Sequence, residues 1–267
     1  MMEIECQPPM PLRHHLFSWP VDLFNKASLL EFLRYRLSTR SKTIIANLNL
    51  HALHCLENSA GMASLINAKS TFVHIDGMPI VWLLKARGIG ASADNRLTYL
   101  DWALDALALC ESEGWTVGYI GSTPEICQKG LVHFRNEYPA LQLMGWDGFF
   151  DMWDTSAGSK LSETLSAVDA FKPDLLIVGM GMPRQEEFLH LYSGRLNYGV
   201  AICSGAFFEY FTGGQKRPPR LWGRLGLEWL YRLAYDPRRY AGRYLLEPLL
   251  LARKLIWSRR RKAAGRA

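Results

Sequence analysis

The sequence predicts an α/β protein in which a mainly parallel sheet is covered by helices on both faces and is followed by a basic helical appendage. Short β-rich runs alternate with helical segments along most of the 267 residues. These runs are apolar at consecutive positions, as in strands that are buried on both faces. The charge also divides the chain, because residues 1–211 contain 16 Lys and Arg against 22 Asp and Glu, whereas residues 212–267 contain 15 against three. We therefore expect a core of residues 1–211 and an appendage of residues 212–267.

Local signals place two of the helices and six strands. Ser28 and Glu31 have the spacing of a capping box, which predicts that a helix starts before the apolar stripe of residues 29–37. Thr123, Pro124 and Glu125 give a later helix its cap, its first-turn proline and its acidic first turn. The predicted strands are, in chain order, residues 43–46, 71–75, 115–120, 141–146, 175–178 and 200–203. This alternation predicts a Rossmann-like sheet.

Every predicted strand ends in polar or glycine residues. The ends are Asn47-Leu48-Asn49, Asp76-Gly77, Gly121-Ser122, Asp147-Gly148, Gly179-Met180-Gly181 and Ser204-Gly205. For any single end, the alternative is that these residues only make a turn. In an open α/β sheet, however, ligands bind beyond the carboxyl ends of the strands. We therefore look for the functional site at these six ends.

The composition limits the compartment and the mode of membrane contact. Five cysteines without Cys-x-x-Cys spacing do not predict a disulfide scaffold and favour a reducing cytoplasm. The first twenty residues lack the pattern of a secretory signal. No run approaches the eighteen uncharged apolar residues of a spanning helix, so any membrane contact should be peripheral. The basic appendage favours phosphate groups, whether on lipid, nucleic acid or a small ligand.

Common nucleotide and metal motifs are missing. Gly179 and Gly181 follow a buried strand, but Arg184 stands where the third glycine of a dinucleotide-binding motif belongs. No phosphate-loop motif of the ATPase type is present. His51 and His54 could share a helix face as metal ligands, yet no carboxylate or cysteine partner is recognisable nearby, and surface histidines are more common. We expect no metal site and no cofactor.

Asp76 is the first candidate for catalysis. It lies between a strand and a helix with Pro79 in its first turn, where a helix N-terminus would lower its pKa and keep it ionised, as a general base requires. The alternative is an N-cap aspartate. Gln185 and Glu186 would bring an amide and a carboxylate to the same crevice at the strand ends. The alternative is that they form only a solvated first turn of a helix.

Three blocks of the sequence resemble the WecG/TagA/CpsF glycosyltransferases. They are VHIDGMPIVW at residues 73–82, PDLLIVGMGMPRQE at residues 173–186, and GLEWLYR at residues 226–232 followed by DPRRY at residues 236–240. Gly205-Ala-Phe and the stretch of residues 213–219 add to the resemblance, which covers roughly residues 40–245. It implies an inverting, metal-independent transferase that builds cell-surface polysaccharide or teichoic-acid linkage units on polyprenyl diphosphate.

The resemblance also implies roles for particular residues. The family's base aspartate matches Asp76 and its active-site glutamine matches Gln185, whereas a threonine of some members falls at Asn47. The UDP-sugar donor is then expected at the strand ends, on Asn47, Asn49, Gly121, Asp147, Gly148, Gly179, Gly181 and Glu186. Diphosphates of the polyprenyl-linked acceptor are expected on Arg217, Arg220, Arg224 and Arg232. The family's arginine-rich appendage corresponds to the residues after 212.

An independent observation agrees with this resemblance. Metal-dependent sugar transferases commonly hold Mn²⁺ or Mg²⁺ on an Asp-x-Asp pair, and no two aspartates here are spaced by one residue. Arginines and helix N-termini would then stabilise the leaving UDP. We expect the protein to be cytoplasmic and bound peripherally to the inner face of the plasma membrane. The appendage, with Trp222, Trp229 and Trp257, would contact anionic lipid.

Two alternatives stay open. The first is a Rossmann-type oxidoreductase, which would bind NAD(P) and not UDP. The second is a nucleic-acid-binding protein that uses the basic appendage. Apolar residues at helical spacing beside the arginines, such as Leu225 and Leu233, favour a membrane interface or packing on the core over nucleic acid.

Overall fold

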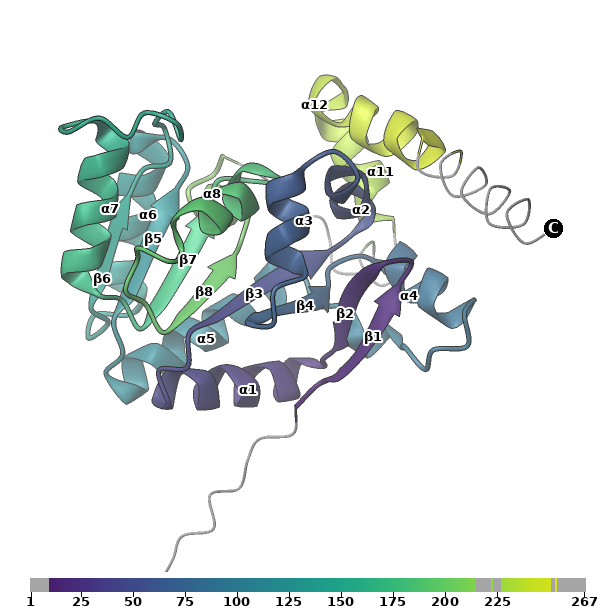
Figure 1. The fold of residues 1–267 in the computed structure, drawn as a ribbon, viewed down its shortest axis with the longest axis horizontal. Helices are drawn as coiled ribbons and strands as arrows, with labels where there is room; N and C mark the ends of the chain where they lie inside the picture. Colours follow the sequence, from purple (N-terminus) through teal and green to yellow (C-terminus); the bar gives the residue numbers. More distant parts are fainter. Residues whose placement is uncertain (1–9, 215–221, 223–226, 251–252, 254–267) are drawn as a thin grey trace, which may run out of the picture.

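The computed structural model describes residues 10–214, 222, 227–250 and 253. Its centre is a sheet of six parallel strands in the order β4-β3-β8-β7-β5-β6 (Figure 1). The strands are β3 (Thr43–Leu48), β4 (Thr71–Ile75), β5 (Val117–Gly121), β6 (Leu143–Trp146), β7 (Leu175–Gly179) and β8 (Val200–Cys203). All six strands predicted from the sequence are present, and they pair in parallel as expected.

Helices cover both faces of this sheet. One face carries α1 (Lys26–Ser38), α5 (Tyr99–Glu113), α6 (Pro124–Glu137) and α9 (Phe207–Phe211). The other carries α2 (Leu50–Leu56), α3 (Ala60–Ile66), α4 (Met78–Lys85), α7 (Lys160–Phe171) and α8 (Arg184–Tyr192). Successive strand residues serve different cores, since Ile44 and Ala46 pack in one apolar cluster and Ile45 in the other. This double use explains the uninterrupted apolar runs of the sequence.

A hairpin that the sequence did not predict precedes the sheet. Its strands are β1 (Leu12–Leu16) and β2 (Trp19–Leu23). Asp22 is fully buried and accepts hydrogen bonds from Arg13, at 2.8 and 2.9 Å, and from the backbone N–H of Val73 on edge strand β4, at 2.7 Å. The hairpin thus covers an edge of the sheet. Sequence reasoning missed it because His14 and Pro20 interrupt the alternation that marks a strand.

Two helix starts test the local signals. At α1 the N-cap is Asn25, whose side chain accepts from the Ser28 N–H at 2.9 Å while the Ser28 hydroxyl accepts from the Asn25 N–H at 3.0 Å. The predicted capping box of Ser28 and Glu31 is therefore wrong by three residues, because asparagine caps helices as well as serine does. At α6 the cap is Thr123, as predicted, with Pro124 at the first position.

The described C-terminal segment is helical and lies over the carboxyl ends of β3 and β4, next to α2 (Figure 1). It consists of α11 (Glu228–Tyr235), α12 (Pro237–Ala241) and the π-helical turn η2 (Gly242–Leu246). None of the helices in the described part of the chain has the length and apolar character needed to cross a bilayer.

Candidate functional site

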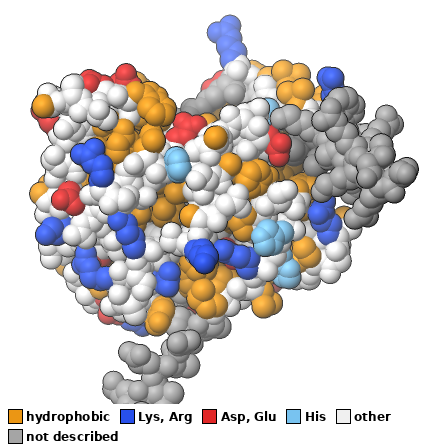
Figure 2. Space-filling view, viewed as in Figure 1, with side chains coloured by type: hydrophobic (Ala, Val, Ile, Leu, Met, Phe, Trp, Pro, Cys, Tyr) orange, Lys and Arg blue, Asp and Glu red, His pale blue; other side chains and the backbone are white. Residues whose placement is uncertain are grey.

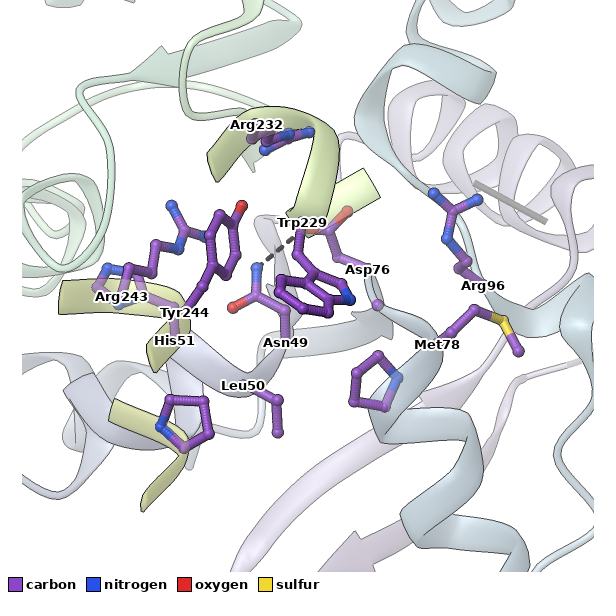
Figure 3. A pocket seen from close by; sticks show the side chains of 13 residues that line it. Asn49, Leu50, His51, Asp76, Met78, Arg96, Trp229, Arg232, Arg243 and Tyr244 are labelled. Atoms are coloured by element: carbon purple, nitrogen blue, oxygen red, sulfur yellow. Dashed lines mark hydrogen bonds between the residues drawn. The ribbon is translucent and has the colours of Figure 1, made fainter. Parts of the chain in front are cut away.

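Asp76 lies at the centre of the polar residues that follow β3 and β4. Asn47 and Asn49 each donate a side-chain N–H to Asp76 Oδ2, at 3.0 and 2.9 Å. Asn49 is also the N-cap of α2, since its Oδ1 accepts from the Ala52 N–H at 2.9 Å. The cap fixes which end of the Asn49 amide faces Asp76. The carboxylate is thus held by donors that come from the end of one neighbouring strand (Figure 3).

The structure corrects two expectations for Asp76. The N-cap of α4 is Gly77, without a side-chain cap hydrogen bond, so the alternative role of Asp76 as a helix cap is wrong. The expected lowering of its pKa is also wrong. Burial at the bottom of the cleft raises the Asp76 pKa above its ordinary value and outweighs the hydrogen bond from Asn49 and the charges of three arginines. A carboxylate with a raised pKa accepts a proton more readily, which suits a general base.

The three arginines come from separate parts of the chain and surround this carboxylate (Figure 3). Arg96 follows the 3-10 turn η1 (Ala93–Asn95), and its backbone pairs with the end of β4. Arg232 comes from α11 and lies over the ring of Tyr210, 6.0 Å from its centre. Arg243 comes from η2. A rim of guanidinium groups around one carboxylate suits a ligand that carries both phosphate and hydroxyl groups.

Three adjoining cavities form one cleft along the carboxyl ends of the strands. We name them the α4-side cavity, the central cavity and the β7-side cavity, with volumes of about 300, 370 and 610 Å³. The first two share Asn49, His51, Asp76, Arg232 and Arg243, and the last two share Met180, Gly181, Gly205 and Ala206. Asp76 therefore lies where two cavities meet. The space-filling view shows the molecule hollowed between the part that carries α6 and α7 and the rest (Figure 2).

Close backbone contacts explain the glycines at the ends of β5 and β7. A Cβ at Gly121 would lie 2.3 Å from the carbonyl oxygen of Gly179, and a Cβ at Gly179 would lie 2.8 Å from that of Gly205. Larger residues would force these strand ends apart. Gly179 therefore lines the β7-side cavity with bare backbone, which lets a ligand approach the main chain closely.

Gln185 lines the central cavity from the first turn of α8. Its Oε1 accepts from the Gly205 N–H at 2.9 Å, and its Nε2 donates to Glu186 Oε1 at 2.7 Å. Glu186 was expected at the same mouth, but it is fully buried and lines none of the three cavities. Successive residues on a helix point about 100° apart, so Gln185 faces the cleft and Glu186 lies behind it.

Asp147 faces away from the cleft. Its carboxylate pairs with Lys160 at 2.6 Å, accepts from the Phe149 N–H at 3.0 Å, and lines a separate cavity between α6 and α7. The structure therefore places Asp147 apart from the other predicted donor residues. Arg184, which breaks the dinucleotide motif, donates to the carbonyl oxygens of Gly148 and Phe150 and holds that loop at the β7-side cavity.

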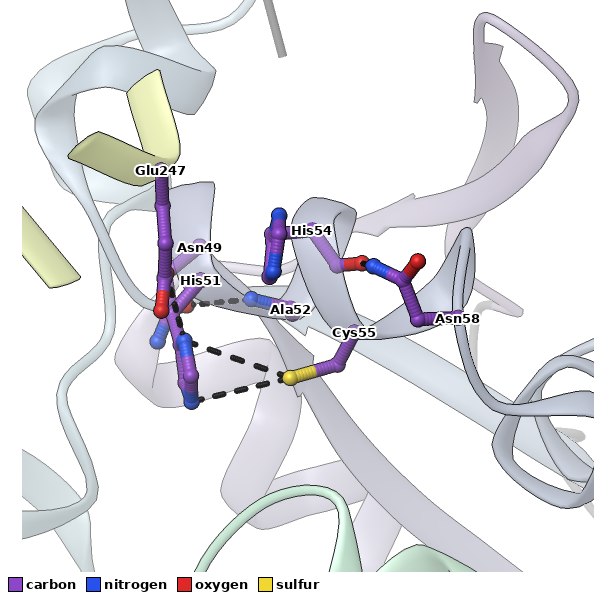
Figure 4. A network of polar contacts seen from close by, with 7 residues as sticks. All are labelled: Asn49, His51, Ala52, His54, Cys55, Asn58 and Glu247. Carbon is purple, nitrogen blue, oxygen red and sulfur yellow. Dashed lines mark hydrogen bonds and ion pairs between the residues drawn. The ribbon is translucent and has the colours of Figure 1, made fainter. Parts of the chain in front are cut away.

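His51 connects the core with the C-terminal segment. Its Nδ1 lies 2.7 Å from Glu247 Oε2, and the side chains are 19% and 17% exposed (Figure 4). The Cys55 sulfur lies 3.6 Å from Nε2 of the same ring. Burial lowers the His51 pKa, and the nearby Arg243 lowers it further, whereas Glu247 raises it. The expectation of a surface histidine is wrong, because His51 lines two cavities of the cleft.

The structure brings many of the predicted residues together. The central cavity is lined by Asn47, Asn49, Asp76, Gly181, Gln185 and Arg232. The β7-side cavity is lined by Gly148, Gly179 and Gly181, and Gly121 supports Gly179 from behind. The predicted residues Arg217, Arg220 and Arg224 lie outside the described residues, as do Leu225 and Trp257.

Sequence reasoning missed Arg96 and Arg243 and did not place Trp229 in the cleft. Arg96 stands in a loop without a motif, so no local signal marked it. Arg243 is one of many basic residues in the appendage, and no spacing distinguished it from its neighbours. Trp229 was expected at the lipid or on the core, yet its indole lines the α4-side cavity, 38% exposed.

The described residues offer no evident metal centre, because no three His, Cys, Asp or Glu side chains among them gather as ligands. The described cysteines are free, buried thiols. In the α4-side and central cavities, the Asp76 carboxylate instead lies beside several amides and a rim of arginines.

A comparison with protein families agrees with this geometry. The model of the glycosyl transferase WecG/TagA/CpsF family matches residues 14–265, nearly the whole chain. The matched region contains the complete sheet, the three cavities and the described C-terminal segment. Members of this family are glycosyltransferases of cell-surface polysaccharide synthesis. The chain therefore belongs to the WecG/TagA/CpsF family of glycosyltransferases.

Proposed function

We propose that this chain is an inverting, metal-independent glycosyltransferase that moves a hexose or N-acetylhexosamine-type sugar from a UDP-sugar to a saccharide on polyprenyl diphosphate. It works at the inner face of the plasma membrane, to which it binds peripherally. One observation supports the proposal most. Asp76, a carboxylate of raised pKa held by two amides, lies between two cavities and within a rim of arginines.

In this mechanism Asp76 accepts the proton of the acceptor hydroxyl. The hydroxyl oxygen attacks the anomeric carbon from the face opposite UDP, so the new C–O bond forms as the bond to the UDP oxygen breaks. UDP leaves with the bonding electrons, and the configuration at the anomeric carbon inverts. Both asparagines bind Oδ2 of Asp76, so in this mechanism Oδ1 takes the proton.

The arginine rim stabilises the leaving group. Negative charge grows on the UDP diphosphate as the glycosidic bond breaks, and fixed guanidinium groups favour that charge. Arg232 and Arg243 border both the central and the α4-side cavity, so they lie within reach of a diphosphate on either side of Asp76. This arrangement supplies the positive charge for which other transferases use a metal on an Asp-x-Asp pair.

The donor fits the β7-side and central cavities. The β7-side cavity, the largest of the three, is lined by Phe149, a residue that is 68% exposed and whose ring offers a surface for a nucleobase. The Glu209 carboxylate lines the same cavity and can accept hydrogen bonds from ribose hydroxyls. The diphosphate would follow the backbone of residues 179–181 toward the central cavity, where the sugar meets Asp76.

The acceptor fits the α4-side cavity. One wall of this cavity is apolar and consists of Leu50, Met78, Pro79, Trp229, Tyr244 and Pro248. Such a wall suits the flat face of a sugar ring and the start of an isoprenoid chain. The neighbouring residues 245–250, in η2 and directly after it, expose Leu245, Leu246, Leu249 and Leu250 to solvent, by 50, 61, 68 and 48%. Together with the excess of 12 positive charges after residue 211, these leucines favour a membrane surface.

A transfer assay tests this proposal. Purified protein is incubated with a panel of UDP-sugars and a polyprenyl-diphosphate-linked saccharide, with and without EDTA, and the anomeric configuration of the product is read by NMR. We expect one UDP-sugar to be consumed with inversion and without a requirement for metal. Retention of configuration, or activity that EDTA abolishes and Mn²⁺ restores, would refute the proposed mechanism.

The two alternatives make different predictions for ligand binding. An oxidoreductase would bind NAD(P) tightly and UDP weakly, and Arg184 in place of the third glycine argues against it. A nucleic-acid-binding protein would bind oligonucleotides in preference to anionic vesicles. Calorimetry with UDP and NAD(P), and retention on oligonucleotides against vesicles at several salt concentrations, separates the three functions.

A further inference from the structure

Glu186 lies directly behind the cleft, and the transfer mechanism gives it no role. Its side chain is fully buried. Oε1 accepts from Gln185 Nε2 at 2.7 Å, whereas Oε2 has no hydrogen-bond partner among the described residues. The Cys203 thiol at the end of β8 borders the carboxyl group, and burial together with Glu186 raises the thiol pKa well above its ordinary value. A buried carboxyl group with only one of its oxygens in a strong hydrogen bond is costly and needs an explanation.

The Gln185 amide connects Glu186 to the cleft. The backbone N–H of Gly205 is an obligatory donor, so the Gln185 atom that faces it at 2.9 Å must be the oxygen. The nitrogen then faces Glu186, which must be the acceptor. One buried chain of hydrogen bonds therefore runs from Glu186 through Gln185 to Gly205.

Gly205 belongs to a wall between two cavities. Residues 205 and 206 line both the central and the β7-side cavity. On one side the wall is fixed to β7, since the Ser204 N–H donates to Val178 O at 2.8 Å. On the other side it is fixed by Gln185. Gly205 has a φ of +58°, a left-handed conformation that glycine adopts without steric cost.

We propose that Glu186 is a positioning residue of the transfer reaction, which touches no substrate but holds Gln185 against Gly205 and so sets the junction between the β7-side and central cavities. The inference rests on the proposed function, because this junction is where the donor diphosphate passes.

Glu186 acts as a neutral acid below neutral pH. Burial raises its pKa to about 7, while the Gln185 hydrogen bond opposes the shift and Glu187 adds to it. Besides Glu187 on α8, the titratable groups near it are Cys203 on β8 and Cys55 on α2.

Kinetics of four variants and one control variant test the role. Glu186→Gln keeps an acceptor for Gln185 and should retain kcat/KM for the UDP-sugar within about threefold, whereas Glu186→Leu should lose about tenfold or more, chiefly through KM. Because Glu186 acts through Gln185, the double variant Gln185→Leu/Glu186→Leu should be no worse than Gln185→Leu alone. Glu187→Gln is the matched control, since that carboxylate accepts from Ser59 away from the cleft.

Thermal unfolding tests the buried acid without any substrate. The folded-state pKa is raised from 4.5 to about 7, so the stabilising effect of the proton is complete below the unfolded pKa and is lost as the pH rises through about 7. Glu186→Gln cannot ionise. Between pH 5 and pH 8, the Tm of the wild type should therefore fall relative to that of Glu186→Gln by roughly 5–10 °C.

The outcomes separate this inference from the proposed function. If the wild type transfers sugar from none of the UDP-sugars, the proposed function fails, and the unfolding comparison still tests the buried acid. If the wild type is active and Glu186→Leu, verified as folded, equals it, the positioning role is wrong. Additive losses in the double variant would show that Glu186 acts independently of Gln185 and would overturn the inference. If the Tm difference between the wild type and Glu186→Gln does not change with pH, Glu186 is not a neutral acid in the folded protein.

Discussion

The two sides of the cleft are built in different ways. On the core side, Asp76, Asn47 and Asn49 lie at the ends of adjacent parallel strands, and hydrogen bonds of 2.9 and 3.0 Å join the two asparagines to Asp76. On the other side, Arg232 and Arg243 come from short helical elements of the C-terminal segment. One side is fixed by the sheet, whereas the other depends on contacts between the segment and the core.

This difference assigns different tasks to the two sides. A proton acceptor must lie within hydrogen-bond reach of its substrate, which favours placement on strand ends. Phosphate binding by guanidinium groups tolerates small displacements, and a segment that arrives last can close over a bound ligand. We therefore expect changes on the core side to impair the chemical step and changes on the C-terminal side to impair binding as well.

The largest effect is expected from Asp76→Asn. The amide has the same shape but cannot accept the acceptor's proton, so kcat should fall by about 10²- to 10⁴-fold while UDP affinity stays near that of the wild type. Stopped assays for kcat and calorimetry for UDP measure the two quantities. A variant that turns over within about threefold of the wild type would remove Asp76 from the chemistry.

Next come Arg232→Ala and Arg243→Ala. Each removes a guanidinium group that faces the reacting carboxylate, so kcat/KM should fall by about tenfold to a hundredfold, with a raised KM for the lipid-linked acceptor. Arg238→Ala, on the exposed surface of α12, is the matched control and should behave as the wild type. Equal losses in all three variants would point to general surface charge instead of the arginine rim.

Much of the core side could be predicted from the sequence. Polar residues that end parallel strands must gather at one edge of the sheet, which singles out Asn47, Asn49 and Asp76 without a structure. Gln185 is found by its place in the first turn of a helix and by the resemblance to the family. The direction of the Asp76 pKa was wrong because the sequence shows a helix start but not the burial that outweighs it. Glu186 was misplaced because neighbours on a helix face different ways, and the sequence does not show which of them meets the cleft.

The C-terminal side could be predicted only in part. Its charge and its apolar spacing were visible, but which arginine reaches Asp76 depends on tertiary packing between α11, η2 and the core. The His51–Glu247 pair joins residues that are 196 positions apart in the sequence. Arg243 likewise reaches Asp76 from a distant part of the chain. No local pattern encodes such a contact. Arg96 was missed for the same reason.

The pH profile sharpens the comparison on the core side. Because the Asp76 pKa is raised, kcat/KM should be lost as the pH falls through a value above the ordinary 3.8. Asn49→Asp puts a second carboxylate beside Asp76 and should raise that pKa further, so activity at low pH should fall about tenfold while activity at high pH changes less. An unchanged acidic limb in this variant would show that Asp76 does not control it.

Vesicle binding tests the exposed leucines. Leu249→Ser/Leu250→Ser removes apolar surface that faces solvent, so partitioning onto anionic vesicles should fall about tenfold while turnover of a detergent-soluble acceptor is kept. Leu104→Ser/Val132→Ser, exposed on the helices α5 and α6, is the matched control. If both pairs partition equally, lipid contact lies elsewhere in the chain.

The smallest effect concerns the contact that holds the two sides together. Glu247→Ala removes the partner of His51 and frees the end of η2, on which Arg243 and Tyr244 lie, so KM should rise about threefold to tenfold while kcat changes little. Glu247→Gln keeps an acceptor for the neutral ring and should restore most of the loss. Glu57→Ala, an exposed glutamate at the end of α2, is the control. Glu247→Ala could bind substrates as the wild type does while Arg243→Ala does not. The C-terminal side would then be held by its other contacts, and its arginines would be as well fixed as Asp76 is by the sheet.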